Sequence, residues 1–300
     1  MRYIVTHTSP DMDAITSVWL IKKFLPGWEK AAVQFVPAGE AIGRTAEVGL
    51  KLTDPVEKMG INLVIQVDTG LGLLDHHQTQ SDKVCAATLT FDYVMKKMEE
   101  SVPAIGKEKL EALQRIVNVV LEDDHFKEIF RSDLLSDYHE FLLSGVLDGL
   151  RLEKPDQDEL YLDFISQALD ALLHQFENRI WAEKEIKENG VEFDTRFGKG
   201  IGFEVINDSV IKLAQKMGYY MVVRKDPRKG YVRIKGRPTT LGEKNIDLTL
   251  VYEKLRKMDP TATWFLHVSK KMLLNGTVKN PKMKPTKLSL GDIIEVLKTL

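Results

Sequence analysis

Residues 2–24, RYIVTHTSPDMDAITSVWLIKKF, decide the fold of the first half of the chain. Residues 3–6 form a short apolar run typical of a strand, and from Ala14 to Phe24 apolar residues recur at helical spacing. A second apolar, β-branched run occupies residues 63–67. Nearly continuous apolar strands that alternate with helices predict an α/β domain, with a parallel sheet and helices on both of its faces.

Both apolar runs end in residues that can bind a metal ion. His7 follows the first run and Asp68 follows the second. In sheets of this kind ligands bind beyond the carboxyl ends of the strands. The sequence therefore predicts that His7 and Asp68 lie on the same rim of the sheet.

Further candidate ligands surround these two positions. His7, Asp11 and Asp13 have the spacing His-x3-Asp-x-Asp, and an imidazole with two carboxylates suits manganese or a similar divalent ion. Either aspartate could instead only cap the helix that follows. Seven residues after Asp68 comes the triplet 75–77, Asp-His-His, in which the carboxylate can orient a neighbouring imidazole.

These motifs, together with a small-residue helix start at residues 85–88, occur in an order that resembles the DHH phosphoesterase superfamily. This superfamily includes RecJ-type exonucleases, oligoribonuclease-like phosphatases, cyclic-dinucleotide phosphodiesterases, exopolyphosphatases and manganese-dependent pyrophosphatases. The resemblance covers roughly the first 125 residues. It implies a catalytic domain that binds two divalent cations, with manganese preferred and magnesium or cobalt as alternatives.

The resemblance also implies a role for each matching residue. One cation would be held by His7 and Asp11, the other by Asp13 and His76, and Asp68 would bridge the two and take part in catalysis. The implied catalytic partner is His77, as a phosphate contact or proton donor, with Asp75 supporting the histidines.

One more aspartate is expected for the second cation. The candidates are Asp123 and Asp124, which follow the apolar residues 119–121, and we prefer Asp123 because it is closer to that run. The alternative is that this acidic cluster is only a solvated helix cap.

The two halves of the chain carry opposite charge. Residues 194–300 contain 22 Lys and Arg against 10 Asp and Glu, a net of +12, whereas residues 1–193 contain 20 against 34, a net of −14. Together with a length of 300 residues this predicts two domains. We expect a catalytic domain at 1–155, a connecting amphipathic helix at 156–190 and a smaller, basic α+β domain for substrate recognition at 191–300.

The basic half suggests a substrate with phosphates and bases. Cations such as Arg233 and Arg237 lie on or beside predicted strands with aromatic residues among them, which suits a short single-stranded oligonucleotide. Residues 264–269, which contain His267, resemble distantly the end of the melanocyte-proliferating-gene exonucleases. This resemblance makes His267 a candidate substrate contact; the alternative is an ordinary buried histidine.

We therefore predict a metal-dependent phosphoesterase that acts on short oligonucleotides or nucleotides. The alternatives are a pyrophosphatase or polyphosphatase, and a non-catalytic metal-dependent nucleotide-binding protein. The lone Cys85 fits a reducing compartment, and neither a secretory signal nor a long apolar stretch is evident, so we expect a cytoplasmic protein that does not bind membranes. The sequence leaves a homodimer open.

Overall fold

The computed structural model describes residues 1–44, 52–101, 105–240, 245–277 and 280–300. The chain divides into two compact units, Met1–Glu177 and Asn178–Leu300, here called the acidic unit and the basic unit. Counted over these ranges, the acidic unit has 17 Lys and Arg against 30 Asp and Glu, and the basic unit has 25 against 14. Their net charges are therefore −13 and +11.

The acidic unit contains a four-stranded sheet in the order β2-β1-β4-β3. Strand β1 pairs in parallel with β2 and β4, whereas β3 pairs antiparallel with β4 at one edge. The prediction of an all-parallel sheet is therefore wrong in this respect, because Gly60 forms a tight turn with φ +61° that returns the chain directly from β3 into β4. The strands are β1 (Arg2–His7), β2 (Ala32–Val36), β3 (Val56–Met59) and β4 (Asn62–Gln66).

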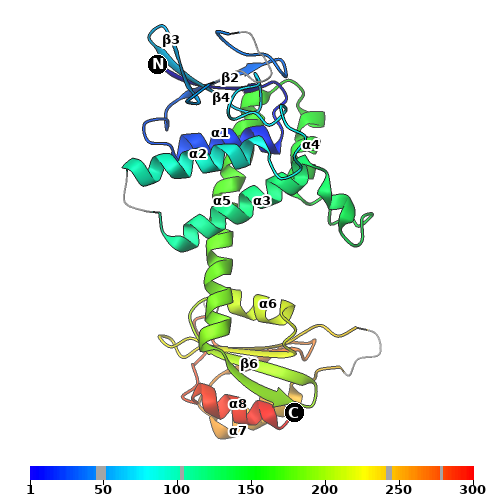
Figure 1. The fold of residues 1–300 in the computed structure, drawn as a ribbon. Helices are drawn as coiled ribbons and strands as arrows, with labels where there is room; N and C mark the ends of the chain where they lie inside the picture. Colours follow the sequence, from blue (N-terminus) through cyan, green and yellow to red (C-terminus); the bar gives the residue numbers. More distant parts are fainter. Residues whose placement is uncertain (45–51, 102–104, 241–244, 278–279) are drawn as a thin grey trace. The chain divides into compact units, whose positions relative to one another are not determined.

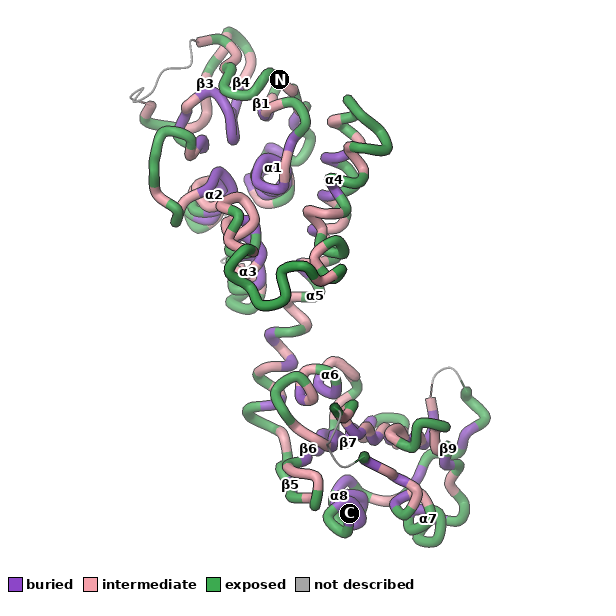
Figure 2. Tube along the Cα trace, turned by 90° about the vertical axis from the view of Figure 1, so that its right-hand side faces the viewer, coloured by how far each residue is buried: buried purple, intermediate pink, exposed green. Residues whose placement is uncertain are grey.

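Helices α1, α2 and α3 of the acidic unit pack on one another. Helices α1 and α2 lie together against one face of the sheet in both views, whereas helices on both faces were expected (Figures 1 and 2). The helices are α1 (Met12–Phe24), α2 (Ala86–Ser101), α3 (Lys107–Asp124), the 3-10 helix η1 (Lys127–Phe130), α4 (Leu143–Glu153) and α5 (Asp158–Asn189). The boundary between the two units falls inside α5.

Apolar spacing explains why α1 sits under the sheet. Ile15, Val18 and Trp19 are buried, as are Ile4 and Ile65 on the strands above them. Burying a side chain of this size contributes about 1.5–3 kcal/mol each. Asp11 caps the start of α1 by accepting a hydrogen bond from the Ala14 amide at 2.9 Å. Packing and capping together hold the loop between β1 and α1 at the end of the sheet.

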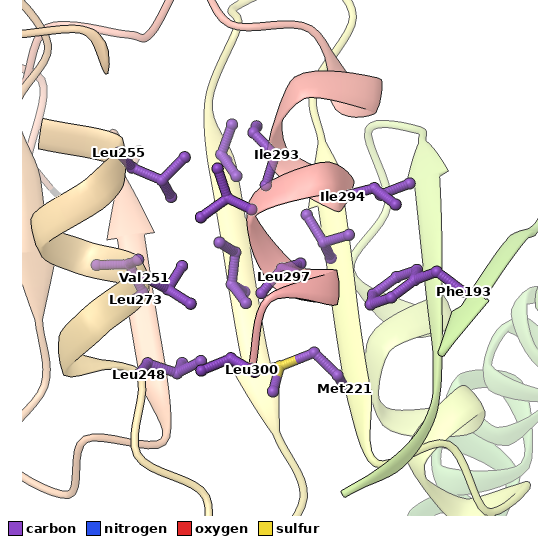
Figure 3. Close-up of a cluster of buried hydrophobic side chains, with 14 of the residues drawn as sticks. Phe193, Met221, Leu248, Val251, Leu255, Leu273, Ile293, Ile294, Leu297 and Leu300 are labelled. Carbon is purple, nitrogen blue, oxygen red and sulfur yellow. The ribbon is translucent and has the colours of Figure 1, made fainter. Parts of the chain in front are cut away.

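The basic unit is built on a six-stranded mixed sheet in the order β5-β6-β7-β8-β10-β9. One face packs on α7 and α8, where Val251, Leu255, Ile293 and Leu297 meet Met221 and Leu273 (Figure 3). The other face packs on α6 and the end of α5. The elements are β5 (Val191–Thr195), β6 (Gly198–Glu204), α6 (Ser209–Lys216), β7 (Met221–Lys225), β8 (Val232–Gly236), α7 (Thr249–Met258), β9 (Trp264–Leu266), β10 (Met272–Asn275) and α8 (Leu290–Lys298).

Across the described ranges, every helix is too short or too polar to cross a membrane.

Candidate metal centre

The strand ends of the acidic unit bring His7 and Asp68 together. His7 is the last residue of β1, and Asp68 comes two residues after its parallel neighbour β4. His7 Nε2 lies 3.3 Å from Asp68 Oδ2, while His7 Nδ1 lies 2.9 Å from the Thr8 carbonyl oxygen. The ring is thus fixed from both sides, with Nε2 directed at the carboxylate.

Asp68 occupies the middle of the cluster. Its Oδ2 faces His7, whereas its Oδ1 lies 3.5 Å from His76 Nε2. The carboxylate is buried, and Oδ1 accepts no hydrogen bond from any described residue. Its backbone has φ +54°, a left-handed conformation that costs free energy for a residue other than glycine. A buried carboxylate with an unsatisfied oxygen, between two histidines, suits a bridging ligand of two cations.

Asp11 and Asp13 each accept a hydrogen bond at the start of a helix and also lie close to the histidines of the candidate metal site. While Asp11 Oδ1 caps α1, its Oδ2 lies 3.9 Å from His7 Nε2. Asp13 accepts hydrogen bonds from the backbone amides of Ala86 and Ala87, at 2.7 and 2.6 Å, which lie at the start of α2. Its Oδ2 is also 3.6 Å from His76 Nε2. Capping and ligation are therefore compatible here.

The Asp-His-His triplet turns its two imidazoles in different ways. His76 is largely buried and directs Nε2 at Asp13 and Asp68. His77 is 59% exposed, and its Nδ1 lies 2.7 Å from Asp75 Oδ1. Asp75 also accepts from the amides of His77 and Leu71. Asp75 therefore orients His77, which leaves the Nε2 of that ring for another partner.

Of the two acidic candidates at the end of α3, the geometry favours Asp124. Asp124 Oδ1 lies 3.7 Å from His76 Nε2, and its Oδ2 is buried without a hydrogen bond from the described residues. Asp123 instead forms a side-chain hydrogen bond with Ser144. Our preference for Asp123 rested on its closeness to the apolar residues 119–121, but this segment is helical, and neighbours on a helix point about 100° apart.

Two residues outside our predicted ligand set also lie at the cluster. His125 Nε2 is 3.7 Å from Asp124 Oδ2 and 3.0 Å from the Val84 carbonyl oxygen. Cys85 is buried beside Asp13 and Asp124. The only sequence signal for His125 was its place directly after the acidic pair.

Several of these groups could hold a metal ion. Within each, the ligand atoms lie within 4.8 Å of one another: Asp68, His76 and His77; His76, Asp124 and His125; His7, Asp11 and Asp68; and Asp13, Cys85 and Asp124. The crowding of carboxylates also favours a bound metal ion. Burial, followed by the charges of Asp68 and Asp124, raises the pKa of Asp13 well above its ordinary value. Cations would relieve this repulsion.

The imidazoles of His7 and His77 are strongly basic without a metal. Burial acts to lower the pKa of His7, but the hydrogen bond to Asp68 and the charge of Asp11 outweigh it, so that the pKa rises to about 9. For His77 the hydrogen bond to Asp75 is the largest cause, and its pKa also rises to about 9. Both rings are therefore protonated at neutral pH in the metal-free protein.

The predicted substrate contacts lie in the basic unit. Arg233 projects from β8 and forms an ion pair with Asp208. Arg237 follows β8, with its guanidinium 3.7 Å from the centre of the Tyr220 ring. His267 comes directly after β9 and is partly exposed, with Nδ1 2.9 Å from Ser269 Oγ. It is therefore not a buried core histidine.

Comparisons with known proteins give little help with identity. No family model matches the chain, and no curated protein matches it significantly. Among solved structures, an uncharacterized protein from Helicobacter pylori G27 matches with a TM-score of 0.24 and 12% identity over 99% of this chain and 98% of that one. A pGpG-specific phosphodiesterase, PggH, from Vibrio cholerae matches with a TM-score of 0.23 and 12% identity, over 93% and 94%. Both TM-scores are too low to carry an argument about this chain.

Proposed function

We propose that this chain is a divalent-metal-dependent phosphoesterase that hydrolyses phosphodiester or phosphomonoester bonds in short oligonucleotides or nucleotides. The observation that carries the proposal is Asp68. Its two carboxylate oxygens are directed at two different histidines, His7 and His76, and the oxygen nearer His76 has no hydrogen bond from the described residues. This arrangement is expected of a ligand shared by two cations.

The residues divide naturally between two cations. His7, Asp11 and Asp68 would hold one; Asp13, His76, Asp68 and Asp124 would hold the other. The mixture of imidazole and carboxylate ligands suits manganese, with magnesium and cobalt as alternatives. Two such ions would lower the pKa of a shared water and stabilise the charge that develops on a phosphoryl group.

His77 can provide a hydrogen-bond donor to the substrate, which the carboxylates of the site cannot. Asp75 holds Nδ1 of the His77 ring and raises the pKa of that ring, which favours a protonated Nε2 on the exposed side of the cluster. Such a group can hold a phosphate oxygen or give a proton to the leaving oxygen. The protein would thus place a cation where the acidic unit would otherwise repel an anionic substrate.

The basic unit supports a substrate that carries bases as well as phosphates. Arg233 and Lys235 alternate with buried residues along β8, so both project from the same face. On that face Phe265 of β9, 47% exposed, lies near His267 with ring centres 6.5 Å apart. Burial and the charge of Arg233 lower the pKa of Lys235. Crowded cations beside an exposed ring favour a bound phosphate with an adjacent base.

The other two functions fit less well. Pyrophosphate offers nothing for Phe265 to stack upon and needs few cations beyond the metals. A non-catalytic nucleotide-binding protein would not require both the shared Asp68 and a separately oriented His77. Each remains an outcome of the experiment below.

The experiment is hydrolysis of a substrate panel by purified protein with added manganese. The panel contains dinucleotides, phosphoadenosine phosphate, cyclic dinucleotides and pyrophosphate. We expect turnover of a nucleotide substrate that chelation abolishes and manganese restores. Full activity in excess chelator, by protein free of metal, would refute the metal centre. Pyrophosphate as the best substrate would refute the nucleotide assignment only.

A matched pair of variants tests the ligand set. Asp124→Asn should lower both manganese affinity and turnover by at least about 100-fold, because Asp124 faces His76. Asp123→Asn removes the same charge from the adjacent residue, which bonds Ser144, and should change either quantity only several-fold. The reverse order of the two effects would return the role to Asp123.

A further inference from the structure

The segment that joins α3 to α4, residues 126–142, displays an unusual number of apolar side chains. Leu135 is 98% exposed, Phe141 85%, Tyr138 83% and Phe130 81%; Phe126, Ile129, Leu134 and Leu142 are also exposed. Most of this stretch is coloured as exposed in Figure 2. Single exposed apolar residues are ordinary, but a contiguous patch marks an interaction site. We call residues 126–142 the apolar segment.

The backbone of the apolar segment has a turn structure of its own. Hydrogen bonds close within it, from Ser136 N to Asp133 O at 3.1 Å, His139 N to Ser136 O at 3.0 Å and Leu142 N to His139 O at 3.1 Å. The side chains of the segment that form ion pairs with other described residues of the acidic unit lie near its beginning: Lys127 pairs with Asp82 and Arg131 with Glu122. The apolar side chains are therefore presented outward on ordered turns.

The exposed apolar area of the segment is comparable to the area that one partner buries in a stable protein complex. The segment contains four aromatic side chains, and each buries about 150–250 Å² when covered. At their observed exposure the four would bury roughly 500–800 Å² together, and the exposed leucines add to this area. A stable complex buries about 800 Å² on each partner. The apolar segment alone thus offers enough surface for a stable partner.

The charges along the segment favour pairing between two copies of it. Its first part carries Lys127, Glu128 and Arg131, a net of +1, and its last part carries Asp133, Asp137 and Glu140, a net of −3. A twofold axis near Leu135 would run two copies antiparallel, with the basic part of each against the acidic part of the other. Repulsion between the net charges of two acidic units is screened beyond about 8 Å at physiological salt.

The charges also disfavour other kinds of partner. Within residues 126–142 two basic residues stand against four acidic ones, and the surrounding unit has a net charge of −13. Anionic lipid surfaces and nucleic acid both attract basic segments. From the area and the charge pattern we infer that the apolar segment is a homodimer interface, covered by the same segment of a second copy of this chain.

Disulfide crosslinking tests the pairing directly in the full-length protein. Cys85 is buried, so a cysteine introduced at an exposed position is the reactive thiol. Leu135→Cys should crosslink under mild oxidant to a species of twice 34.1 kDa. Ile61→Cys, at a position 93% exposed in the same unit, is the control and should remain single. Equal crosslinking of the two variants would mean random collision and would overturn the inference.

The mass in solution gives a second, independent test. Wild-type protein should be dimeric by light scattering, and the double variant Tyr138→Asp/Phe141→Asp should be monomeric. Both side chains are exposed and take no part in the hydrophobic core, so the variant should still fold. Ile61→Asp with Val268→Asp makes the same chemical change at exposed sites outside the segment and should stay dimeric. Arg131→Asp should raise the dimer dissociation constant at least about tenfold, and adding Asp137→Arg should restore it.

Three results would contradict the homodimer. One is a monomeric wild type at about 100 µM, which is far above the dissociation constants of standard-size interfaces. The second is a dimer that survives the changes at Tyr138 and Phe141. The third is monomeric protein that binds vesicles of anionic phospholipid through the apolar segment, in which case the occupant is a membrane surface.

Discussion

Asp68 is the residue on which the proposed chemistry most depends. It is buried in a left-handed conformation, with its two oxygens directed at different histidines. Asparagine has nearly the same size and tolerates a left-handed backbone well, so Asp68→Asn should fold normally. We expect turnover to fall by at least about 100-fold, because the charge shared by both cations is lost. The measurement is turnover, together with the unfolding midpoint.

The control for this change is Asp92→Asn. Asp92 lies exposed on α2 in the same unit, and the substitution is chemically identical. It should leave turnover within about twofold of wild type, as is usual for a surface position. If Asp68→Asn behaves like this control, Asp68 is not a bridging ligand.

The basicity of His7 predicts a pH dependence of metal binding. Its pKa without metal is about 9, above the ordinary value of 6.5, so a proton stabilises the folded metal-free protein below pH 6.5 and this stabilisation is lost as pH rises through 9. Manganese must displace that proton. Between pH 7 and 8.5 the apparent manganese affinity should rise about tenfold per pH unit. Affinity that stays constant over this range, measured by calorimetry, would remove His7 from the ligand set.

At the scale of the element, α8 closes the core of the basic unit. Leu297 is fully buried among Met221, Leu255 and Ile293 (Figure 3). A capping box at Ser289 and Asp292 fixes where the helix begins. The helix thus owes its place to packing on the sheet and its start to a local hydrogen-bond pair.

Leu297→Ala should therefore destabilise the basic unit by about 2–5 kcal/mol, because it leaves a cavity among close-packed side chains. Glu295→Ala, on the exposed side of the same helix, should cost no more than about 0.5 kcal/mol. Urea unfolding of the full chain, fitted with one transition for each unit, measures both. Manganese affinity should not change in either variant, since the candidate ligands all belong to the acidic unit. A Leu297→Ala variant as stable as wild type would show that α8 is not part of this core.

At the scale of the whole molecule, the opposite charges of the two units predict how binding responds to salt. If the basic unit holds a short oligonucleotide, affinity should fall with salt, and each lost phosphate contact should flatten that dependence by about one counterion. Lys235 is the sharpest probe, because it has no ion pair among the described residues, whereas Arg233 is paired with Asp208. Lys235→Ala should weaken binding several-fold and reduce the slope.

Lys216→Ala is the control for this measurement. Lys216 ends α6 and is exposed, so its loss changes the net charge equally but removes the charge from a helix and not from β8. The measurement is the affinity of each variant for a short single-stranded oligonucleotide at several salt concentrations. Equal effects of Lys235→Ala and Lys216→Ala would mean that only net charge, and not this face of the sheet, attracts the substrate.

The sequence by itself determined the parts of the molecule that depend on local pattern. Apolar runs predicted β1 and β4, helical spacing predicted α1 and α5, and strand ends placed His7 and Asp68 at one edge of a sheet. These features follow from the periodicity of each element and from the geometry of parallel strands.

Tertiary structure alone decided the rest. The antiparallel pairing of β3 depends on the course of a turn, and the position of Asp124 beside His76 depends on the rotation of α3 about its own axis. The approach of His125 and Cys85 depends on how helices far apart in the chain pack together. Sequence spacing carries none of this, because distances between separate elements are set by how their buried side chains fit, and not by the number of residues between them.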